Sequence, residues 1–597
     1  MFNKIKVTIS NAYFKIIPNF QYRLQSFTSM YNMSIKNFIP KLLLGCLLVM
    51  NVLQINAQQK PNILWITCED ISPFIGAYGD KLVKTPNIDL LARDGVRYNN
   101  VYTTAGVCAP SRSAIITGMY QTSIGTQHMR TGGDPKFLPV PVYSAVIPDY
   151  VKCFPEFLRK AGYYCTNNEK QDYQFQAPVT VWDENSPAAS FRNSPANKPF
   201  FAIYNLFITH ESQLFGRKDS LLLDSNKLNV PPYYPDTKIV RHDMDRLFTN
   251  IERMDSQVGE LIQMLKDDGL YDNTIIFFFS DHGGALPWMK REILERGTHI
   301  PLIIHFPGGK NAGTVNDDLI SAVDFAPSVL SLAGVQIPAY MQGQAFLGTQ
   351  KAKTPRKYVF AARDRMDTEY DRVRMVKDKQ FQYLYNYMPE KPYYQNIEYR
   401  LSIPMMREFL KLRDEGKLDS FQAAWFKTKP VEELYDVVND PHELYNLAND
   451  LKYKNKLIEL RTAFQTWTKT VGDMGSIPEK EMIKQMWNGK NEPPVTDTPE
   501  VINTGNGIKL TCKTKGASIG YRVIKQGIPP QPELHTVQSW DFGFVANKIK
   551  NGDKLLAAPV WNVYNGETIS IQAGDTLRVN AMRIGYKAAV INYVGGK

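Results

Sequence analysis

The chain has 597 residues, of which 43% are hydrophobic, 12% aromatic and 22% charged. This composition excludes a disordered or fibrous protein and is sufficient for a large core plus one or two smaller domains. The formal net charge is +11. Residues 1–57 carry six lysine and arginine residues and no acidic residue, so this segment supplies more than half of the net charge. The remaining charge is too mild and too dispersed to indicate a nucleic-acid-binding protein.

The N-terminal segment has the layout of a secretory signal peptide. From Met33, two lysines precede an apolar run at 42–53 and a small-residue cleavage site that ends at Ala57. We therefore expect a periplasmic or secreted protein cleaved near Ala57, with Met33 as a second candidate start. The run is short and has no stop-transfer flank, so no stable membrane anchor is expected. A lipoprotein anchor at Cys46 is disfavoured because mainly apolar residues follow it.

The chain has six cysteines, at positions 46, 68, 108, 153, 165 and 512. Removal of the signal peptide takes Cys46 away and leaves five, an odd number, which draws attention to an unpaired thiol in an exported protein. Cys153 and Cys165 are candidates for a disulfide across a short helix. The cysteine spacings do not match a metal-binding pattern.

Short apolar runs alternate with helical patterns along the first two thirds of the chain. Four runs predict buried strands of the kind found in parallel sheets: 61–67, 198–208, 273–280 and 300–306. One helical pattern ends at Gly162 after a basic last turn, and another ends before Gly269 after apolar residues at helical spacing from Ile251 to Leu265. This alternation predicts an α/β core over 58–380.

Acidic and imidazole side chains follow three of these runs directly. Glu69 and Asp70 follow the first run, His210 the second, and Asp281 with His282 the third. Taken singly, such residues are commonly helix caps or turn residues. Jointly they lie where ligands bind in open α/β sheets, outside the carboxyl ends of the strands. Their oxygen-rich set favours Ca²⁺ over Zn²⁺.

The stretch "CAPSR" at 108–112, followed by "TG" at 117–118, resembles the Cys-X-Pro-Ser-Arg signature of type I sulfatases, in which the cysteine is oxidised to formylglycine. The resemblance covers most of the chain and extends to three further stretches: "PNILWITCED" (61–70), "FFFSDHGG" (277–284) and "EELYDVVNDPHELYNLAND" (432–450). The local patterns are most similar to the heparan N-sulfatase-like branch, which in bacteria includes enzymes acting on algal polysaccharides such as ulvan.

The resemblance implies an alkaline-phosphatase-like sulfatase fold and one Ca²⁺ per chain. The implied metal set departs from the commonest pattern, because Glu69 replaces an aspartate and His282 stands where asparagine is frequent. It further implies a partner that converts Cys108, either a formylglycine-generating enzyme or an anaerobic sulfatase-maturing enzyme. The implied metal-binding residues are Glu69, Asp70, Cys108, Asp281 and His282.

The chemistry of sulfate esters agrees with an aldehyde at Cys108, because their sulfur is shielded by oxygens. One hydroxyl of a hydrated aldehyde, acidified by a metal ion, would attack sulfur as the bond from sulfur to the sugar oxygen breaks. The other hydroxyl then loses its proton and expels sulfate as the aldehyde re-forms, which an ordinary serine or cysteine does not achieve. Arg112, expected one helical turn after Cys108, would neutralise the developing charge.

Further catalytic and substrate-binding residues are implied by position. Lys170 falls where the family has a sulfate-binding lysine, and Asp172 replaces the family's nearby histidine. Lys290, eleven residues before Pro301, falls at the second sulfate lysine, with Arg291 as its competitor. His210 resembles the histidine that protonates the leaving oxygen, a role suited to an imidazole near neutral pH.

Two segments are candidates for sugar recognition. In "GTQHMR" (125–130), His128 and Arg130 are predicted to contact substrate, and Arg130 would bind a carboxylate or a second sulfate. The segment 381–400 is rich in aromatic residues, which stack on sugar faces. Tyrosines in such numbers are equally typical of core packing, so both interpretations of 381–400 stay open.

The sequence of the C-terminal third predicts a subdomain, a linker and a small domain. A smaller α+β subdomain covers 381–487, a polar linker with prolines covers 488–500, and 501–597 alternates apolar and polar residues between turn glycines, which predicts a small antiparallel β domain. This domain resembles the C-terminal β modules of bacterial glycan hydrolases, and a covering role is slightly favoured over sugar binding.

The sequence therefore predicts a secreted sulfatase that acts on a sulfated polysaccharide or its oligosaccharides, with ulvan and heparan-type glycans as candidates. Two alternatives remain: a phosphoester or phosphonate ester hydrolase of the same superfamily, and an inactive glycan-binding homologue. The sequence leaves open the sugar, the position of the sulfate, exo or endo action, and the oligomeric state.

Overall fold

The structure is a computed structural model that describes residues 60–132, 138–528 and 560–596. The described residues from Pro61 onward belong to one compact unit. The predicted signal peptide, its cleavage site near Ala57 and Cys46 lie outside the described residues. Among the residues described, no helix has the length and apolar character needed to cross a membrane.

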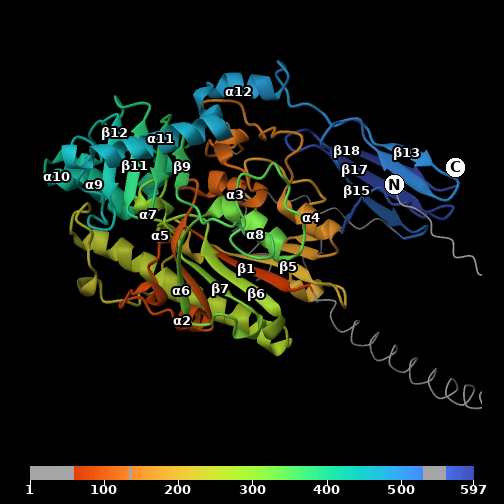
Figure 1. Ribbon diagram of the computed structural model, residues 1–597, viewed down its shortest axis with the longest axis horizontal. Helices are drawn as coiled ribbons and strands as arrows, with labels where there is room; N and C mark the ends of the chain where they lie inside the picture. Colours follow the sequence, from red (N-terminus) through yellow and green to blue (C-terminus); the bar gives the residue numbers. More distant parts are fainter. Residues whose placement is uncertain (1–59, 133–137, 529–559, 597) are drawn as a thin grey trace, which may run out of the picture. The chain divides into compact units, whose positions relative to one another are not determined.

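A mixed eight-stranded sheet forms the centre of the molecule, in the order β4-β3-β5-β1-β6-β7-β2-β8 (Figure 1). Its strands are β1 (Asn62–Cys68), β2 (Gly95–Tyr102), β3 (Tyr164–Asn168), β4 (Glu184–Asn185), β5 (Phe200–Leu206), β6 (Thr274–Ser280), β7 (Leu302–His305) and β8 (Thr314–Ser321). β1 is parallel to β5 and β6. Every residue of β1 and β6 is buried, since both faces of the sheet are covered.

One sequence prediction about this sheet is wrong in direction. The run at 300–306 does form a strand, β7, but β7 pairs antiparallel with both β6 and β2. A fully apolar run reports that a strand is buried on both faces, and this burial is the same for either direction. The apolar pattern therefore cannot show whether β7 runs parallel or antiparallel to its neighbours.

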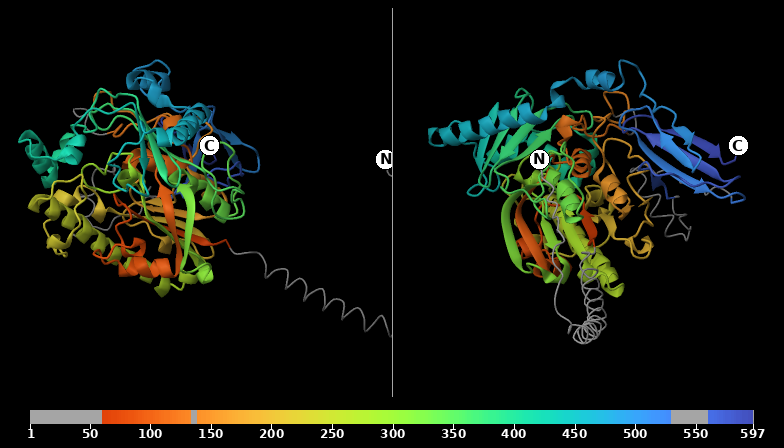
Figure 2. Two further views of the ribbon diagram at one scale, coloured as in Figure 1. Left: turned by 60° about the vertical axis from the view of Figure 1, so that its left-hand side comes forward. Right: turned by 45° about the vertical axis from the view of Figure 1, so that its right-hand side comes forward.

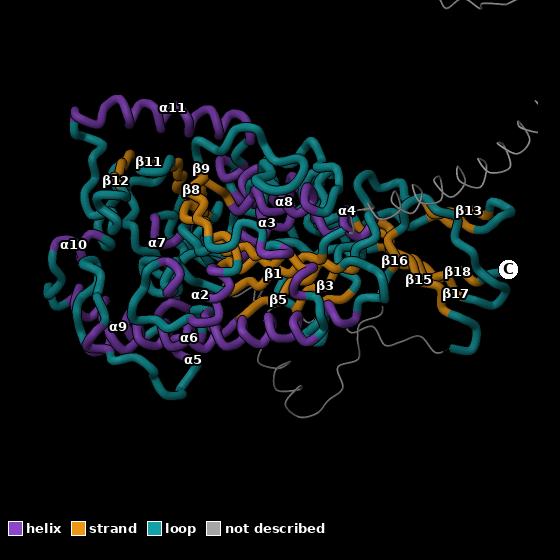
Figure 3. Tube along the Cα trace, turned by 60° about the horizontal axis from the view of Figure 1, so that its bottom comes forward, coloured by secondary structure: helices purple, strands orange, loops and turns teal. Residues whose placement is uncertain are grey.

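Helices cover both faces of the sheet. One face packs against α2 (Pro86–Arg93) and α6 (Lys238–Asp267), and the other packs against α3 (Cys108–Thr117), α4 (Phe154–Lys160) and α8 (Phe325–Leu332). The long helix α6 runs along the sheet (Figure 3). Thr237 caps α6 by accepting a hydrogen bond from the Val240 amide, and the apolar side of the helix is buried from Val240 to Leu265.

A second, four-stranded antiparallel sheet has the order β12-β11-β10-β9. Its strands are β9 (Val359–Arg363), β10 (Val373–Lys377), β11 (Phe381–Asn386) and β12 (Glu432–Asp436), and the helices nearby in sequence are α9 (Pro404–Asp414), α10 (Ser420–Ala424), α11 (Lys454–Val471) and α12 (Glu479–Met486). Aromatic and leucine side chains of α11 pack on this sheet. The sheet includes strands on both sides of residue 380, where the sequence places a boundary; the domain boundaries stay predictions.

The C-terminal segment contains the expected antiparallel β-strands: β13 (Glu500–Asn503), β14 (Ile508–Thr511), β15 (Ser518–Ile524), β16 (Asn562–Val563), β17 (Thr576–Met582) and β18 (Ala589–Val594). Figure 2 shows these strands, in blue, side by side. Lys152, just before α4, donates hydrogen bonds to the Gly516 carbonyl at 2.6 Å and to Ser518 Oγ at 2.8 Å. These bonds join the β module to the helical layer of the central sheet.

The disulfide considered between Cys153 and Cys165 is not formed. Both thiols are buried and free, as are Cys68 and Cys108. Cys165 lies at the start of β3 and packs against α4, so the two cysteines face the same apolar core without bonding to each other. Buried cysteines at these positions act as small apolar side chains.

Candidate functional site

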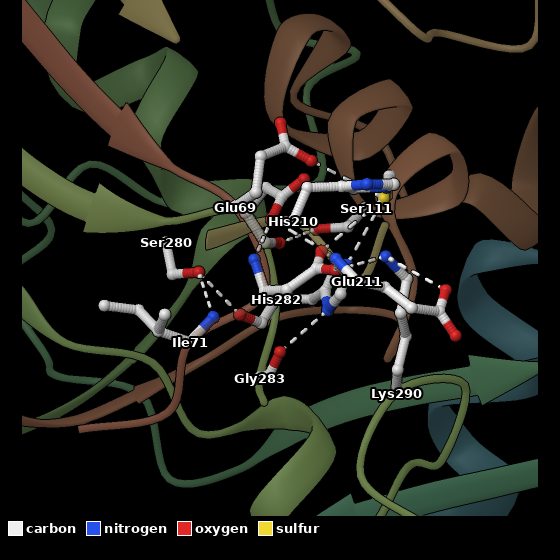
Figure 4. Close-up of polar contacts among 12 residues, drawn as sticks. Glu69, Ile71, Ser111, His210, Glu211, Ser280, His282, Gly283 and Lys290 are labelled. Carbon is white, nitrogen blue, oxygen red and sulfur yellow. Dashed lines mark hydrogen bonds and ion pairs between the residues drawn. The ribbon is translucent and has the colours of Figure 1, made fainter. Parts of the chain in front are cut away.

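The loops that follow β1, β5 and β6 converge on one buried cluster around Cys108. Cys108 Sγ lies 3.3 Å from His282 Nε2, 3.8 Å from Glu69 Oε2 and 3.9 Å from Asp70 Oδ1. Two overlapping groups have ligand atoms within 4.8 Å of one another: Glu69, Asp70, Cys108 and His210, and Asp70, Cys108, Asp281 and His282. Figure 4 shows Glu69, His210, His282 and Lys290 pointing into this cluster. The structure thus brings together all five predicted metal ligands.

Strand register explains why residues so far apart in sequence meet. Cys68, the last residue of β1, pairs with Leu206 of β5 on one side and with Ser280 of β6 on the other. The three strands therefore end at the same level. The amide of Glu69 donates to the Leu206 carbonyl at 3.3 Å, and the amide of Asp281 donates to the Cys68 carbonyl at 3.2 Å. The carboxyl ends of adjacent parallel strands form a shared ligand site.

Helix α3 carries Cys108 at its first position and is anchored to β6. Ser111 Oγ donates to the Asp281 carbonyl at 2.6 Å. One turn after the cysteine, Arg112 donates from Nε to Asp281 Oδ2 at 2.9 Å and from Nη1 to Asn205 Oδ1 at 2.8 Å. Every residue of α3 is buried. These bonds fix the orientation of the helix and place the Arg112 guanidinium beside the acidic cluster.

Two buried lysines bind the carboxylates that follow β1. Lys170 Nζ donates to Glu69 Oε2 at 2.6 Å and lies 3.8 Å from Asp172 Oδ2. Lys290 Nζ donates to Asp70 Oδ2. Burial disfavours the charged form of Asp70, but Lys290 and His282 outweigh it and hold the pKa of Asp70 well below its usual range. Both lysines thus lie at the cluster, and their binding of sulfate stays a prediction.

His210 presents one ring nitrogen to the site. The Ser212 amide donates to His210 Nδ1 at 3.2 Å, and the ring stacks on Phe207 with centroids 4.6 Å apart. Because Nδ1 accepts this bond, the neutral ring carries its proton on Nε2. Burial and the nearby Lys290 hold the pKa of His210 well below its ordinary value. The neutral ring is therefore a donor through Nε2–H.

His282 is held in one orientation at the base of the cluster. Its Nδ1 lies 3.0 Å from the Gly283 carbonyl and donates to it, which turns Nε2 toward Asp70 Oδ1 at 2.8 Å. Burial lowers its pKa, but Asp281 and Asp70 outweigh burial and raise the pKa of His282 to about 10. A backbone carbonyl that orients an imidazole in this way is common at metal sites.

Sequence reasoning missed Glu211, which is buried beneath the cluster. The Glu211 amide donates to Asp70 Oδ2 at 2.7 Å, and its carboxylate receives two bonds from Arg291, at 2.7 and 2.9 Å. Arg291 is only 1% exposed. The structure therefore places Arg291 as the partner of Glu211 and not on an open surface; its predicted substrate contact stays a prediction. The position of Glu211 directly after His210 was the available signal.

The predicted sugar-recognition residues lie in a loop beside the site. Burial lowers the pKa of His128 to about 4, and its Nδ1 accepts a bond from the Arg365 amide at 3.3 Å. Arg130 has a side chain that is 29% exposed, pairs with Asp367 and lies 5.0 Å from the Tyr399 ring centroid. Within 381–400, tyrosines such as Tyr383, Tyr385, Tyr393 and Tyr394 pack inside the subdomain.

The fold and the cluster together define a class of enzyme. A mixed α/β sheet ends in a cluster of three carboxylates, two imidazoles, two lysines and an arginine around one cysteine at a helix start. Such a set is suited to a divalent cation and to a tetrahedral oxyanion ester. This is the composition of a metal-assisted ester hydrolase.

Comparisons with known proteins identify the family. A family model described as Sulfatase matches residues 61–335, and one described as N-sulphoglucosamine sulphohydrolase, C-terminal, matches residues 284–387. An ulvan-active sulfatase of Formosa agariphila is 45% identical over 572 residues, covering 89% of this chain and 91% of the relative. Human N-sulphoglucosamine sulphohydrolase is 24% identical over 472 residues, covering 71% of this chain and 93% of the relative. The chain belongs to the sulfatase family and is a sulfuric ester hydrolase.

Solved structures confirm the sulfatase fold predicted from the sequence. A structure in complex with its substrate D-glucosamine-2-N,6-O-disulfate has a TM-score of 0.51 at 19% identity, covering 70% of this chain and all of the other. A 2-O glycosaminoglycan sulfatase has a TM-score of 0.51 at 21% identity, covering 69% and 93%. At these identities the likeness concerns the fold alone.

Proposed function

We propose that the chain removes sulfate groups from a sulfated polysaccharide or its oligosaccharides, with ulvan as the first candidate and heparan-type glycans as the second. The convergence of Cys108, Arg112 and the acidic cluster at the strand ends carries this proposal. The 45% identity to an ulvan-active sulfatase over 89% of the chain supports ulvan as the first substrate to test.

The acidic cluster fits one Ca²⁺. The ion would be held by the carboxylates of Glu69, Asp70 and Asp281, by His282 Nε2 and by the side chain of Cys108. These residues belong to two overlapping groups, and within each group the ligand atoms lie within 4.8 Å of one another. Hard oxygen ligands in this number suit Ca²⁺ better than Zn²⁺. When bound, the ion would supply positive charge that acidifies an attacking hydroxyl and polarises the sulfate.

Cys108 is proposed to act after conversion to formylglycine by a maturing enzyme. Its place at the first turn of α3 puts the side chain where backbone amides point outward and anionic groups are stabilised. A hydrated aldehyde there would supply the nucleophile and a second hydroxyl for release of sulfate. An unmodified thiol offers no comparable route to reset the site.

The surrounding cations and His210 would bind the sulfate, neutralise developing charge and protonate the leaving oxygen. Lys170 and Lys290 would bind sulfate oxygens, since each Nζ already binds a carboxylate oxygen of the cluster. Arg112 would neutralise charge that develops beside Cys108, because its guanidinium is held between Asp281 and Asn205. Bound sulfate would add negative charge beside His210 and favour its protonated form. In that form Nδ1–H would donate to Ser212 Oγ, 2.9 Å away, and Nε2–H would protonate the leaving sugar oxygen.

Secretion and binding of sulfated carbohydrate complete the proposal. The signal-peptide layout of residues 33–57 supports export with cleavage near Ala57, which would bring the enzyme to polysaccharides outside the cytoplasm. Mass spectrometry of the mature N-terminus, after expression of the full chain in a Gram-negative host, tests this step. A retained N-terminus would contradict export.

The direct test is release of sulfate from ulvan oligosaccharides and from heparan-type disaccharides, with NMR of the products. Mass spectrometry of the Cys108 peptide in the same preparation should show exchange of SH and H for a carbonyl oxygen. Faster turnover of aryl phosphate or phosphonate esters than of every sulfate ester would favour the phosphorus alternative. Absence of turnover with a converted Cys108 would favour a glycan-binding role.

A further inference from the structure

A carboxylate on helix α12, 370 residues or so along the chain from the nucleophile, lies at the centre of a buried hydrogen-bond cluster. Glu479 is the first residue of α12 and is 3% exposed. It receives bonds from Arg365 Nε at 2.5 Å and Arg365 Nη2 at 2.7 Å. The hydroxyl groups of Tyr143 and Tyr370 donate to it at 2.9 and 2.6 Å. These four bonds fill the acceptor sites of the carboxylate.

Arg365, held by Glu479, also forms hydrogen bonds to the loop that contains His128 and Arg130. Arg365 Nη1 donates to the Met129 carbonyl at 2.8 Å, and the Met129 amide donates to the Arg365 carbonyl at 2.8 Å. The Arg365 amide also donates to His128 Nδ1 at 3.3 Å. The residue immediately before Arg130 is therefore bonded to Arg365 through both of its backbone groups.

The same arginine fixes the partner of Arg130. Arg365 Nη1 donates to the Asp367 carbonyl at 2.5 Å, and the Asp367 carboxylate pairs with Arg130. Arg130 and Asp367 both have left-handed backbone conformations, with φ of 58° and 50°. Such conformations cost free energy in residues with a side chain and persist where the surroundings hold them.

Helix α12 also packs directly on the loop. Gln127 Nε2 lies 3.4 Å from Met482 Sδ, and a Cβ added at Gly125 would lie 2.3 Å from Met486 Cε. The left-handed φ of 77° favours glycine at 125, and the contact with the flexible end of Met486 places α12 against this turn. In Figure 1, α12 lies above α3 and the orange segments of the central domain. Glu479 at the start of α12 is therefore linked to segment 125–130 through Arg365, and Met482 and Met486 further along the helix contact the segment directly.

This loop borders the catalytic cluster on two sides. Gln174, in the loop that carries Lys170, donates to the His128 carbonyl and accepts from the Thr131 amide. On the other side, the Arg130 guanidinium lies over the Tyr399 ring, which contacts Phe215 at 5.8 Å between centroids, and Phe215 belongs to α5 (Gln213–Gly216), just after His210. Arg130 is thus a part-exposed cation at the border of the site.

We propose that Glu479 is a positioning residue that, through Arg365, sets Arg130 to bind a second anionic group of the sulfated sugar, beyond the sulfate that is cleaved. This inference rests on the proposed function, because it assigns specificity to the same site. Helix α12 would then contribute to substrate specificity through Glu479, although none of its residues is required for attack on sulfur.

The test compares Glu479→Gln with Glu481→Gln, an exposed glutamate on the same helix. Substrates are ulvan oligosaccharides, which carry further charges, and 4-nitrophenyl sulfate, which carries none beyond its sulfate. For Glu479→Gln we expect KM for the oligosaccharides to rise about tenfold with kcat and the nitrophenyl sulfate constants within about twofold of the parent. Glu481→Gln should match the parent on both substrates.

A double-mutant cycle with Arg130→Ala shows whether Glu479 acts through Arg130. Arg130→Ala alone should raise KM for the oligosaccharides, and Glu479→Gln should add nothing to it in the double variant. Independent, multiplying effects would overturn the proposal. Equal losses of kcat/KM on both substrates, or no change on either, would overturn it as well, since Glu479 would then be structural or dispensable.

Tyr370→Phe covers the case in which Glu479→Gln does not fold. It removes one bond to the carboxylate and keeps the ring, whose centroid lies 6.4 Å from that of His128. We expect a smaller rise in KM, about threefold, again confined to the oligosaccharides. An unchanged KM would contradict the proposal. Failure of the proposed function is separate: the parent enzyme itself would release no sulfate from either substrate.

Discussion

Arg112 and Asp281 join the helix of the nucleophile to the strand that supplies a candidate metal ligand. The Arg112 Nε lies 2.9 Å from Asp281 Oδ2, and both side chains are at most 7% exposed. Because Asp281 directly follows β6 while Arg112 is one turn into α3, this pair couples the orientation of the two elements. A second carboxylate, Glu69, binds Nη2 of the same guanidinium.

Arg112→Lys should therefore lower kcat/KM by about 10²-fold or more on both glycan and nitrophenyl sulfate. Lysine keeps the charge but has a single ammonium group, which does not reach Asp281, Glu69 and Asn205 together. Steady-state kinetics on the two substrates measure the effect. Arg93→Lys, an exposed arginine at the end of α2, is the control and should match the parent. A loss restricted to KM for the glycan would contradict the assigned role.

Replacement of Cys108 should abolish turnover, because the proposed nucleophile derives from this residue. Cys108→Ala removes it outright, and Cys108→Ser should be inactive in a host that lacks a serine-converting enzyme. Activity is measured together with mass spectrometry of the Cys108 peptide. Cys512→Ser, at a part-exposed thiol in the β module, is the control. Full activity from an unconverted cysteine would refute the mechanism.

Chelation should remove activity, and Ca²⁺ should restore it. The cluster is rich in carboxylate oxygens, which suits a hard cation, and ion binding to the folded state should also raise Tm. Activity and Tm are measured after dialysis against chelator and after return of Ca²⁺ or Zn²⁺. Asp70→Ala and Asp281→Ala should lose both responses. Restoration by Zn²⁺ alone would overturn the assignment of Ca²⁺.

His210→Ala should distinguish substrates by their leaving group. A sugar oxygen is a poor leaving group, so loss of the proton donor should cost about 10²-fold to 10⁴-fold on a sugar sulfate. Nitrophenyl sulfate needs no proton and should be spared. Lys290→Ala, which affects binding of the sulfate itself, should harm both substrates similarly. Equal losses for His210→Ala would make it a sulfate-binding or structural residue and pass the acid role to Lys290 or His128.

Glu443 should make stability fall as pH rises. Burial raises its pKa from an ordinary value of 4.5 to about 8. Between these values the folded chain keeps a proton that the unfolded chain has released, so the free energy of unfolding decreases with pH through this window. Glu443→Gln should remove the dependence and raise Tm by about 3 °C at pH 8, with a smaller gain at pH 5.

The surroundings of Glu443 accommodate this change. The Glu295 amide donates to Glu443 Oε2 at 2.8 Å, which a glutamine carbonyl also accepts. The neighbouring Gln382 has a buried Oε1 that no described residue hydrogen-bonds. After a flip of its amide, this oxygen would accept from the new NH₂. Thermal melts from pH 5 to pH 9 measure the effect, with the exposed Glu390→Gln as control. A Tm difference that does not vary with pH would contradict the assignment.

Local sequence determined much of this protein. The "CAPSR" stretch forms the first turn of α3, and the runs at 61–67, 198–208 and 273–280 form three strands of the central sheet, because buried strands and short motifs leave signals within a few residues. The polar residues that follow those strands meet as expected, since the strands end level. The sulfatase family was therefore recognisable from the sequence alone.

Tertiary structure decided what depends on pairing between distant segments. Contacts between segments far apart in sequence decide the antiparallel direction of β7, the burial of Arg291 against Glu211, and the bonds that Arg365 donates to Glu479. Packing in one core decides the free state of Cys153 and Cys165. Hydrophobic periodicity records only whether a side chain is buried. It carries no information on which buried partner a charged group finds, because that choice depends on the register and packing of the whole chain.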